Sequence, residues 1–335
     1  MKKNLIILFL LINSLSSHAV NLIDNEHVNA QKDCFSWIFT SYDSWRSAME
    51  KKYKKNVKSD QLLAKRMSWF DSNFGEEKFN KYKANLSCQT FNYDVDGILV
   101  KGYVIKPKHA DKKLPVLVYN RGGNGNFGGV VFGAMMHNLF PIANEGFVII
   151  GSQYRGTFTK DDSLDEFGGK DIDDVLALLT FVPDITGADN KRIGMYGASR
   201  GGMQTHLALK QTKQVKAIAT IAGATDLLKE LEFRPAMEKV YKHRIPSYKV
   251  NKVDELSKRS VLNWVNGLSP EVPILLIHGG NDKRVSVNNS IEFAKALDST
   301  KIPHKLVIYP DDNHGLQKNQ SAANQEIINW FNKFL

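Results

Sequence analysis

The chain has 335 residues and a formal net charge of +10, with 42% hydrophobic and 24% charged residues. This composition is typical of a globular protein with a sizeable core and excludes a disordered chain. The basic balance comes with no nucleic-acid-binding motif, and the densest basic run, 51–58, falls in a stretch of helical periodicity. We interpret that run as a solvated helix face, so nucleic acid is not expected as a partner.

The first 19 residues have the layout of a secretory signal peptide. Lys2 and Lys3 precede the apolar run Leu5–Ile12, and residues 17–19 provide a cleavage site. The apolar run is too short to span a bilayer, and no later segment is apolar over about 20 residues. We therefore expect an exported protein, in the periplasm or outside the cell, with no stable membrane insertion once the signal is removed.

Residues 20–86 are predicted to form a helical N-terminal extension. Apolar residues recur at helical spacing from Phe35 to Met49, and shorter patterns over 62–70 and 79–82 predict two further helices. We interpret the aromatic residues of this segment as packing residues rather than as a ligand surface.

The chain contains two cysteines, Cys34 in this extension and Cys88 just after it. Disulfides form and persist in the oxidising compartments that an exported protein enters. We therefore expect Cys34 and Cys88 to form a disulfide, and two buried free thiols are the alternative.

From residue 87 onwards the pattern changes to alternating strands and helices. Two runs rich in β-branched residues flank Asp96-Gly97, a pair typical of a hairpin turn. The strands predicted after the hairpin are PVLVYN, GFVIIGS, RIGMYG, VKAIATIA, PILLIHG and HKLVIYP. Longer helical stretches separate these strands, which predicts an α/β fold with a mostly parallel, doubly wound sheet. Residues 225–267 are more polar and are predicted to form a helical excursion over one end of the sheet.

Between the strand RIGMYG and the next helix stands Gly197-Ala198-Ser199-Arg200-Gly201. Gly-x-Ser-x-Gly at a strand-to-helix turn is the pattern of a nucleophile elbow, whose tight turn lifts the serine hydroxyl clear of the backbone. The turn also directs the N–H of Arg200 and the start of the helix at the reacting centre, where both stabilise an oxyanion. Ser199 is therefore a candidate nucleophile, and a serine in an ordinary glycine-rich turn is the alternative.

A serine nucleophile needs a histidine base and an acid that orients the base. In folds of this kind the three follow in the chain order serine, acid, histidine. Asp282 follows the strand PILLIHG and His314 follows HKLVIYP, so both lie at the sheet edge where Ser199 is expected. Asp282 and His314 are therefore the candidate acid and base.

Three other residues compete for these roles. Asp311 and Asp312 are acidic, but they lie so close to His314 in the chain that we interpret them as loop residues. His278 ends a strand near Asp282, and we interpret it as structural because the base should follow the acid.

The second oxyanion donor is expected from the loop after the strand PVLVYN. That loop begins Arg121-Gly122-Gly123, and its glycines let the backbone approach a substrate oxygen. A phosphate-binding loop is the alternative, but the sequence has no strand–GxGxxG–helix unit and no Walker lysine. No metal ion or organic cofactor is expected.

Residues 87–335 resemble the catalytic domain of the prolyl oligopeptidase family of serine peptidases, within the α/β-hydrolase superfamily. The resemblance rests on six stretches in the same order, YNRGGNG, EGFVIIGSQYRG, EFGGKDIDDVLALL, YGASRGGMQT, HGGNDKRVSVNNSIEFAKAL and LVIYPDDNHGL. It implies that Ser199, Asp282 and His314 form a catalytic triad.

The resemblance also bears on the oxyanion hole. Arg121 stands where some members of the family have a tyrosine hydroxyl, so the N–H of Gly122 is the implied donor beside that of Arg200. The alternative is a contact between the Arg121 side chain and a carboxylate or carbonyl of the substrate.

We therefore expect an exported serine hydrolase that forms an acyl-enzyme on Ser199, first of all a peptidase of the prolyl oligopeptidase type acting on small peptides. A carboxylesterase with the same triad is the alternative. A non-catalytic binding protein that uses 20–86 as its partner surface is a third interpretation. Segment 20–86 is too short and too helical to be the β-propeller of the family's large members, so their size filter is not implied.

Overall fold

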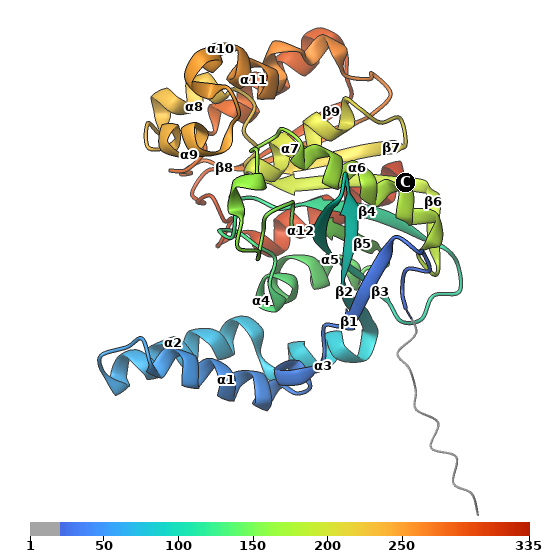
Figure 1. The fold of residues 1–335 in the computed structure, drawn as a ribbon, viewed down its shortest axis with the longest axis vertical. Coiled ribbons are helices and arrows are strands. Elements are labelled where there is room, and N and C mark those ends of the chain that lie inside the picture. The colour runs from blue at the N-terminus through green and yellow to red at the C-terminus, as the bar shows by residue number, and fades with distance from the viewer. Residues whose placement is uncertain (1–20) are drawn as a thin grey trace, which may run out of the picture.

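The computed structural model describes residues 21–335, and the signal peptide predicted for 1–19 lies outside the described residues. The centre of the molecule is a nine-stranded sheet in the order β1-β2-β3-β5-β4-β6-β7-β8-β9 (Figure 1). In chain order the strands are Val28–Asp33, Leu86–Val95, Ile98–Pro107, Leu114–Asn120, Val148–Ser152, Ala188–Ala198, Val215–Ile221, Ile274–Gly279 and His304–Tyr309.

The sheet is antiparallel at its start and parallel from β4 onwards. β2 and β3 form the predicted hairpin, whose turn places Asp96 at a φ of 55° and Gly97 at 77°. β3 pairs antiparallel with β5, and the pairs from β5–β4 through β8–β9 are all parallel. The predicted α/β class, a mostly parallel sheet with an antiparallel hairpin, is therefore confirmed.

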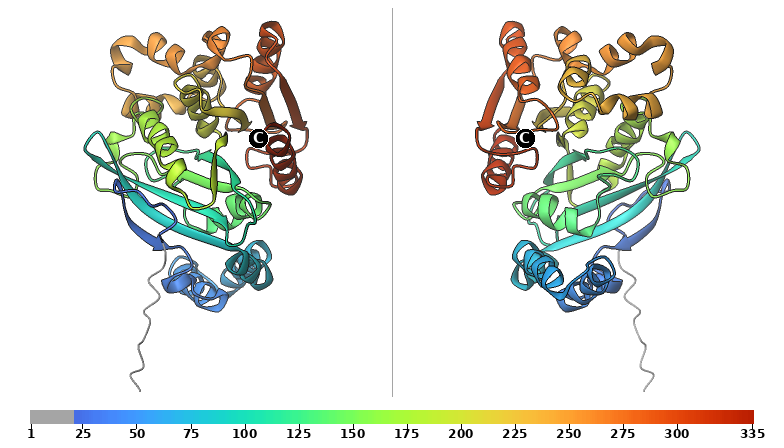
Figure 2. Two further views of the ribbon diagram at one scale, coloured as in Figure 1. Left: turned by 90° about the vertical axis from the view of Figure 1, so that its right-hand side faces the viewer. Right: turned by 90° about the vertical axis from the view of Figure 1, so that its left-hand side faces the viewer.

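Helices cover both faces of the sheet because successive strand residues point to opposite sides (Figure 2). Val116 and Val118 of β4 join the core that includes residues of α6, α7 and α11, whereas Leu117 joins the core on the other face. The helices of the first face are α6 (Asp171–Phe181), α7 (Arg200–Leu209) and α11 (Asn288–Thr300), and those of the second are α4 (Phe132–Ala134), a π-helical turn (Met135–Leu139), α5 (Phe140–Ala143) and α12 (Gln320–Phe334).

The excursion predicted for 225–267 folds as a helical layer at one end of the sheet (Figure 1). Its helices are α8 (Leu227–Phe233), α9 (Met237–Arg244) and α10 (Tyr248–Arg259). The short 3-10 helices of the chain are Trp37–Phe39, Asp162–Leu164, Val182–Asp184, Val261–Asn263 and Val265–Gly267.

The N-terminal segment forms a helical arm of α1 (Tyr42–Lys54), α2 (Asp60–Phe74) and α3 (Glu76–Asn85). The first helix starts later than its apolar spacing predicts, because the Ser41 hydroxyl accepts the N–H of Ser44 at 3.1 Å and caps it. Trp45 of α1 packs on Phe70 at 4.8 Å and on Phe132 of α4 at 5.0 Å between ring centroids, which holds the arm against the sheet domain.

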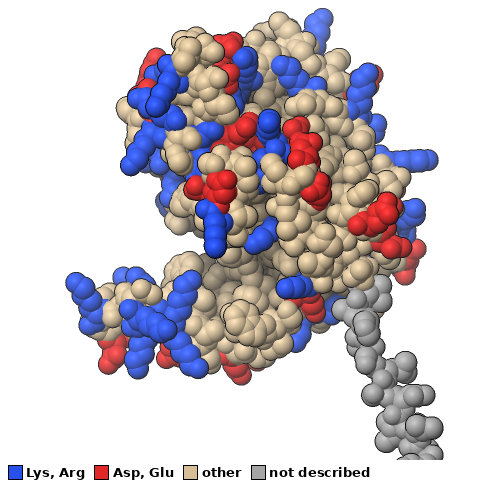
Figure 3. Space-filling model, viewed as in Figure 1, with Lys and Arg blue, Asp and Glu red and all other residues tan. Residues whose placement is uncertain are grey.

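The arm carries the basic run at its far end. Lysines of 51–58 are exposed where α1 ends and the chain turns into α2, and Figure 3 shows Lys and Arg side chains gathered on this part of the molecule. Among residues 21–335, the structure contains no helix that combines the length and the apolar character needed to cross a bilayer.

The segment predicted as a helical extension also contains a strand, β1. β1 pairs antiparallel with β2 and extends the sheet at its edge. A disulfide joins Cys34, which directly follows β1, to Cys88 in β2. The N-terminal segment is therefore attached to the sheet domain by a strand pair and a covalent bond as well as by aromatic packing.

Candidate active site

Ser199 lies on a strained turn between β6 and α7. Its φ and ψ are 58° and −123°, in the region that favours glycine, as a nucleophile elbow requires. A Cβ on Gly197 would overlap the carbonyl of Gly201, and a Cβ on Gly201 would overlap the carbonyl of Asn120 at the end of β4. Both glycines are therefore needed for so close an approach of turn, helix and strand.

Gly122, in the loop after β4, lies directly beside Ser199. A Cβ on Gly122 would stand 3.2 Å from Ser199 Cβ and 2.9 Å from the carbonyl oxygen of Ala198. Only glycine brings a backbone so close to the serine. The backbone of Gly122 and the N-terminus of α7, which begins at Arg200, therefore both lie next to the side chain of Ser199.

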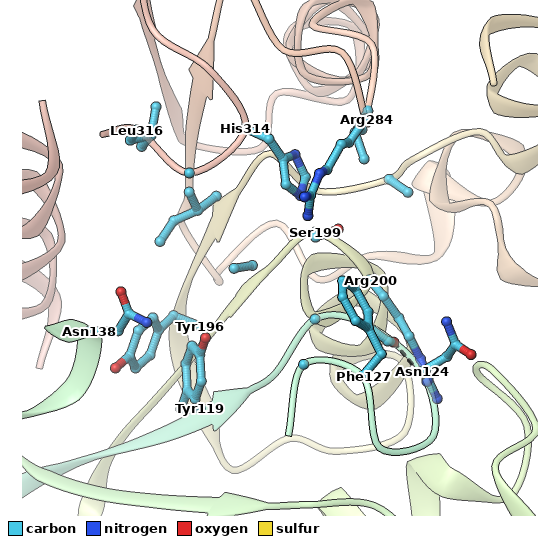
Figure 4. Close-up of a pocket in the computed structure, with 18 of the residues that line it drawn as sticks. Tyr119, Asn124, Phe127, Asn138, Tyr196, Ser199, Arg200, Arg284, His314 and Leu316 are labelled. Carbon is cyan, nitrogen blue, oxygen red and sulfur yellow. Dashed lines mark hydrogen bonds between the residues drawn. The ribbon is translucent and has the colours of Figure 1, made fainter. Parts of the chain in front are cut away.

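Asp282 and His314 meet at the carboxyl ends of β8 and β9. His314 Nδ1 lies 2.6 Å from Asp282 Oδ2, while Asp282 Oδ1 accepts the N–H groups of Arg284 at 2.7 Å and Val285 at 3.1 Å. Figure 4 shows the imidazole of His314 pointing towards Ser199. The structure therefore brings the three candidate residues, from three strand ends, to one place.

The environment of Asp282 keeps its carboxylate ionised. Burial alone would raise the pKa of Asp282, but hydrogen bonds from His278 and His314 outweigh this and hold the pKa below its usual value. An ionised carboxylate only accepts hydrogen bonds, so the proton of the short contact lies on His314 Nδ1. The other ring nitrogen, Nε2, is then free to act as a base.

Two of the rival residues, His278 and Asp312, have structural roles, and Asp311 is exposed. The Nε2 of His278 lies 3.2 Å from Asp282 Oδ2, and its Nδ1 lies 2.7 Å from Ser290 Oγ. Asp312 is buried and accepts the backbone N–H of Asn319 at 2.8 Å, which shapes the loop that carries His314. His278 therefore supports Asp282 from behind, and Asp312 supports the histidine loop.

The side chain of Arg200 forms a buried network that the sequence reasoning missed. Its Nη2 lies 2.6 Å from both Asp165 Oδ1 and Asp171 Oδ2, and its Nη1 donates to the carbonyl of Gly123 at 3.0 Å. Asp165 also accepts the N–H of Gly125 at 2.6 Å. The residue after Ser199 thus anchors the loop of Gly122. The signal was the acidic stretch DEFGGKDID, 165–173, which contains both aspartates and leads into a buried helix.

The alternative interpretation, in which the Arg121 side chain contacts a substrate, is wrong. Arg121 is 1% exposed, and its guanidinium donates to the carbonyls of Gln153 at 2.8 Å, Gly122 at 3.0 Å and Gly125 at 2.8 Å. It also donates to Thr157 Oγ1 at 2.7 Å. A planar guanidinium whose donors are all directed at the protein has none left for a ligand, so Arg121 shapes the loop from inside.

A cavity of about 540 Å³ opens around Ser199 and His314. Figure 4 shows Tyr119, Asn138, Tyr196 and Leu316 on one side of Ser199 and Asn124, Phe127 and Arg200 on the other. Further lining residues come from the excursion 225–267 and from the loop after β8 that carries Asp282, which we call the acid loop. They are Glu230, Arg234, Met237, Val240, Tyr241, Arg284 and Val285.

Three charged residues of this lining, Glu230, Arg234 and Arg284, were not anticipated from the sequence. Arg284 points towards Ser199 from the acid loop (Figure 4). It follows Asp282 by two residues, and this closeness to the candidate acid could have marked it as a residue of the site. Glu230 is buried on the inner face of α8 beside Leu227. An acid that recurs with apolar residues at helical spacing is the pattern that could have revealed it.

The chain is similar to known proteins both in sequence and in fold. Residues 133–335 match the sequence model of the prolyl oligopeptidase family. The chain is 25% identical over 240 residues to a Bacillus subtilis protein named uncharacterized peptidase YtmA, covering 71% of this chain and 90% of that protein. It is 26% identical over 259 residues to dipeptidyl-peptidase 5 of Porphyromonas gingivalis, covering 72% of this chain and 36% of that protein.

Among solved structures, acylaminoacyl peptidase of Pyrococcus horikoshii has a similar fold. The match has a TM-score of 0.66 at 23% identity and covers 76% of this chain and 43% of that one. The chain thus spans most of the length of YtmA but less than half the length of the two larger peptidases.

Proposed function

Because the chain belongs to the prolyl oligopeptidase family of serine peptidases, we propose that it is an exported peptidase that cleaves small peptides through an acyl-enzyme on Ser199. The hydrogen bond of 2.6 Å between Asp282 and His314 carries this proposal, because it orients an imidazole towards the serine of the elbow. That arrangement has one well-known chemical use, the activation of a hydroxyl for attack on a carbonyl carbon.

In the first half of the reaction, Ser199 Oγ attacks the carbonyl carbon of the scissile bond. His314 Nε2 takes the hydroxyl proton and then gives it to the leaving nitrogen, which departs as an amine. Asp282 keeps the imidazole in the required tautomer and stabilises it while it is charged. In the second half, His314 activates a water that releases the acyl group and restores the Ser199 hydroxyl.

The oxyanion of each tetrahedral intermediate lies between the N–H groups of Arg200 and Gly122. The first belongs to the opening turn of α7, whose N–H groups have no acceptor within the helix. The second belongs to the glycine that touches Ser199. Fixed donors of this kind need no rearrangement as the charge develops, and each typically contributes 10²- to 10³-fold to kcat.

Export is supported by the sequence and by the disulfide. Residues 1–19 have the layout of a signal peptide. Cys34 and Cys88 are bonded to each other, as is usual in the periplasm or outside the cell. An intact mass that begins at Val20 in the mature protein is the expected result, and retention of residues 1–19 on the exported chain would contradict it.

A fluorophosphonate probe tests the catalytic part of the proposal. Labelling of the intact protein and its loss in Ser199→Ala are expected, because the probe reacts with an activated serine. Intact protein that stays unlabelled would favour a binding protein instead. Parallel assays on peptide amides and short-chain p-nitrophenyl esters then separate a peptidase from a carboxylesterase. A kcat/KM for esters thousands of times higher than for every peptide would overturn the peptidase assignment.

A further inference from the structure

Glu230 is a buried acid in the wall of the catalytic cavity that the proposed reaction does not use. Its side chain is on α8 and the residue is 3% exposed. One oxygen, Oε1, accepts the N–H of Ser286 at 3.1 Å and the Nδ2 of Asn289. The second oxygen, Oε2, accepts no hydrogen bond from any described residue, yet it is not sealed off from the cavity.

No cation of residues 21–335 forms an ion pair with this carboxylate. Arg234 directly follows α8 and lines the same cavity, but it forms no ion pair with Glu230. Arg200 is already paired with Asp165 and Asp171. Burying a carboxylate without a cation is unfavourable, and this burial raises the pKa of Glu230 to about 7.

The surroundings of Glu230 define the shape of a group that could reach it. Phe167 lies 4.5 Å from the Arg200 guanidinium and 5.2 Å from the ring of Tyr241, so these residues form a continuous wall from Ser199 to α9. Met237, Val240 and Val285 line the same region. Apart from Arg234 and Arg284, which line the same cavity, these walls are apolar and the acid stands among them, which suits a ligand with an apolar stem and a positively charged end.

This region receives the acyl part of the substrate in the proposed reaction. His314 protonates the leaving group, so the leaving group lies beside the histidine loop, whose Leu316 is on the other side of Ser199 from Arg200 (Figure 4). The region between Arg200 and Glu230 is left for the acyl group. The placement therefore rests on the function proposed above.

We propose that Glu230 binds a cationic nitrogen, ammonium or guanidinium, on the acyl part of the substrate. The nitrogen donates to Oε2 and supplies the charge partner that the carboxylate lacks, as a charge-assisted hydrogen bond in an apolar wall. Two sources carry this chemistry, the side chain of lysine or arginine next to the scissile bond and the free amino terminus of a substrate. The peptidase is then selective for one of these classes of positively charged substrate.

Two pairs of substrates distinguish the sources. N-acetyl-lysine and N-acetyl-norleucine p-nitroanilides differ in the side-chain charge, and leucine and N-acetyl-leucine p-nitroanilides differ in the charge at the amino terminus. At pH 8 we expect one pair to show at least a tenfold preference in kcat/KM for the charged member. Glu230→Gln should reduce that ratio to near one, because its amide oxygen keeps the bonds to Ser286 and Asn289 while the charge is lost.

The exposed Glu232 provides the matched control on the same helix, outside the cavity. Glu232→Gln makes the same charge change and should leave both ratios unaltered. A preference that persists in Glu230→Gln, or the absence of a preference in both pairs of the wild-type protein, would overturn the proposal.

The pH dependence of the ratio gives a second readout. In the lysine pair, whose ammonium stays charged up to about pH 10, the preference of the wild-type protein should grow as pH rises through 7 and Glu230 loses its proton, and most of this growth should be lost in Glu230→Gln. Other groups that face Glu230 are Asp282, His278 and Tyr241, and His314 lines the same cavity. These groups are also present in Glu230→Gln, so any part of the pH dependence that persists in this variant belongs to them and not to Glu230.

Labelling by the fluorophosphonate probe separates failure of this inference from failure of the proposed function. Protein that is not labelled has no activated serine, and both proposals then fall. If the protein is labelled but turns over none of the four substrates, hexylamine and hexanol are added separately during the reaction with the fluorophosphonate probe. The extent to which each compound slows the labelling of Ser199 is then compared. Equal protection by the two would overturn the role of Glu230 alone, and stronger protection by the amine, lost in Glu230→Gln, would support it.

Discussion

Arg200 and Asp165 form a buried ion pair, with Nη2 2.6 Å from Oδ1, at the residue that follows Ser199. Burial alone would lower the pKa of Arg200, but the carboxylates of Asp165 and Asp171 outweigh it and raise the pKa above its usual value. Because Asp165 also holds the N–H of Gly125, the pair joins the serine turn to the loop that carries Gly122. One charge network thus fixes the positions of the two proposed oxyanion donors, the N–H groups of Arg200 and Gly122, relative to each other.

Replacing Asp165 by asparagine should loosen this connection. Asparagine keeps the shape but removes the charge, so Arg200 is left buried with Asp171 as its remaining acidic partner. We expect the free energy of unfolding to fall by about 3 kcal/mol and the rate of fluorophosphonate labelling to fall about 100-fold as the donors lose their alignment. Denaturant unfolding and labelling kinetics measure the two effects.

Asp173 supplies the control for this variant. It lies on α6 close to Asp171 in sequence but outside the network, so Asp173→Asn should change neither quantity appreciably. If the Asp165→Asn variant reacted with the fluorophosphonate probe as fast as the wild-type protein, the network would stabilise the fold but would not position the oxyanion donors.

The sequence predicted those features that depend on local pattern. Alternation of apolar strands and helices gave the α/β fold, and the strict geometry of Gly-x-Ser-x-Gly located the turn of Ser199. Asp282 and His314 followed from the rule that parallel strands end at one sheet edge. Each of these predictions needs only residues that are close in the chain together with one rule of topology.

The features that were missed depend on contacts between distant segments. The N-terminal strand β1 could not be read from its own residues, because a strand at a sheet edge is defined by its partner β2. Arg121 looked accessible in a glycine-rich loop, but the loop folds its carbonyls around the guanidinium. Helical spacing places Glu230 on the same buried face of α8 as Leu227, but the sequence does not show that this face lines the cavity, because that depends on the packing of α8 beside the loop of Asp282.

The buried guanidinium of Arg121 predicts a loss of activity that does not depend on substrate charge. Arg121→Met leaves several carbonyls of the loop without donors, so the loop of Gly122 should lose its shape. We expect hydrolysis of p-nitrophenyl acetate and of the carboxylate-bearing p-nitrophenyl succinate to fall by the same factor, about 100-fold. A loss confined to the succinate ester would restore Arg121 as a substrate contact.

The disulfide between Cys34 and Cys88 should stabilise the protein without affecting the cavity. The bonded residues are 54 apart in sequence, and a loop of that length corresponds to about 4 kcal/mol of chain entropy in the unfolded state. The double variant Cys34→Ser, Cys88→Ser should therefore unfold at a clearly lower temperature, while its folded form labels at the wild-type rate. Dithiothreitol should lower the melting temperature of the wild-type protein and leave that of the variant unchanged. A variant as stable as the wild type would contradict the assigned role.

His206 predicts a loss of stability in mild acid. It lies within α7, 1% exposed, with no hydrogen-bond partner for either ring nitrogen among the described residues and with Phe293 at 4.9 Å. Burial lowers the pKa of His206 to about 3, whereas a histidine in an unfolded chain has a pKa of about 6.5. Between these values the unfolded chain binds a proton that the folded protein does not, so stability decreases as pH falls. From pH 7 to 5 this amounts to about 2 kcal/mol, at 1.4 kcal/mol for each pH unit below 6.5.

The variant His206→Leu should therefore lose about 2 kcal/mol less than the wild-type protein between pH 7 and pH 5, as measured by urea unfolding at both values. Leucine keeps the apolar contact with Phe293 and brings no nitrogen to desolvate. The exposed His243 on α9 gives the matched comparison, and His243→Leu should follow the wild-type pH dependence. An unchanged slope in His206→Leu would mean that the ring takes up its proton in the folded state, through an opening of α7 that admits water to the space beside Phe293.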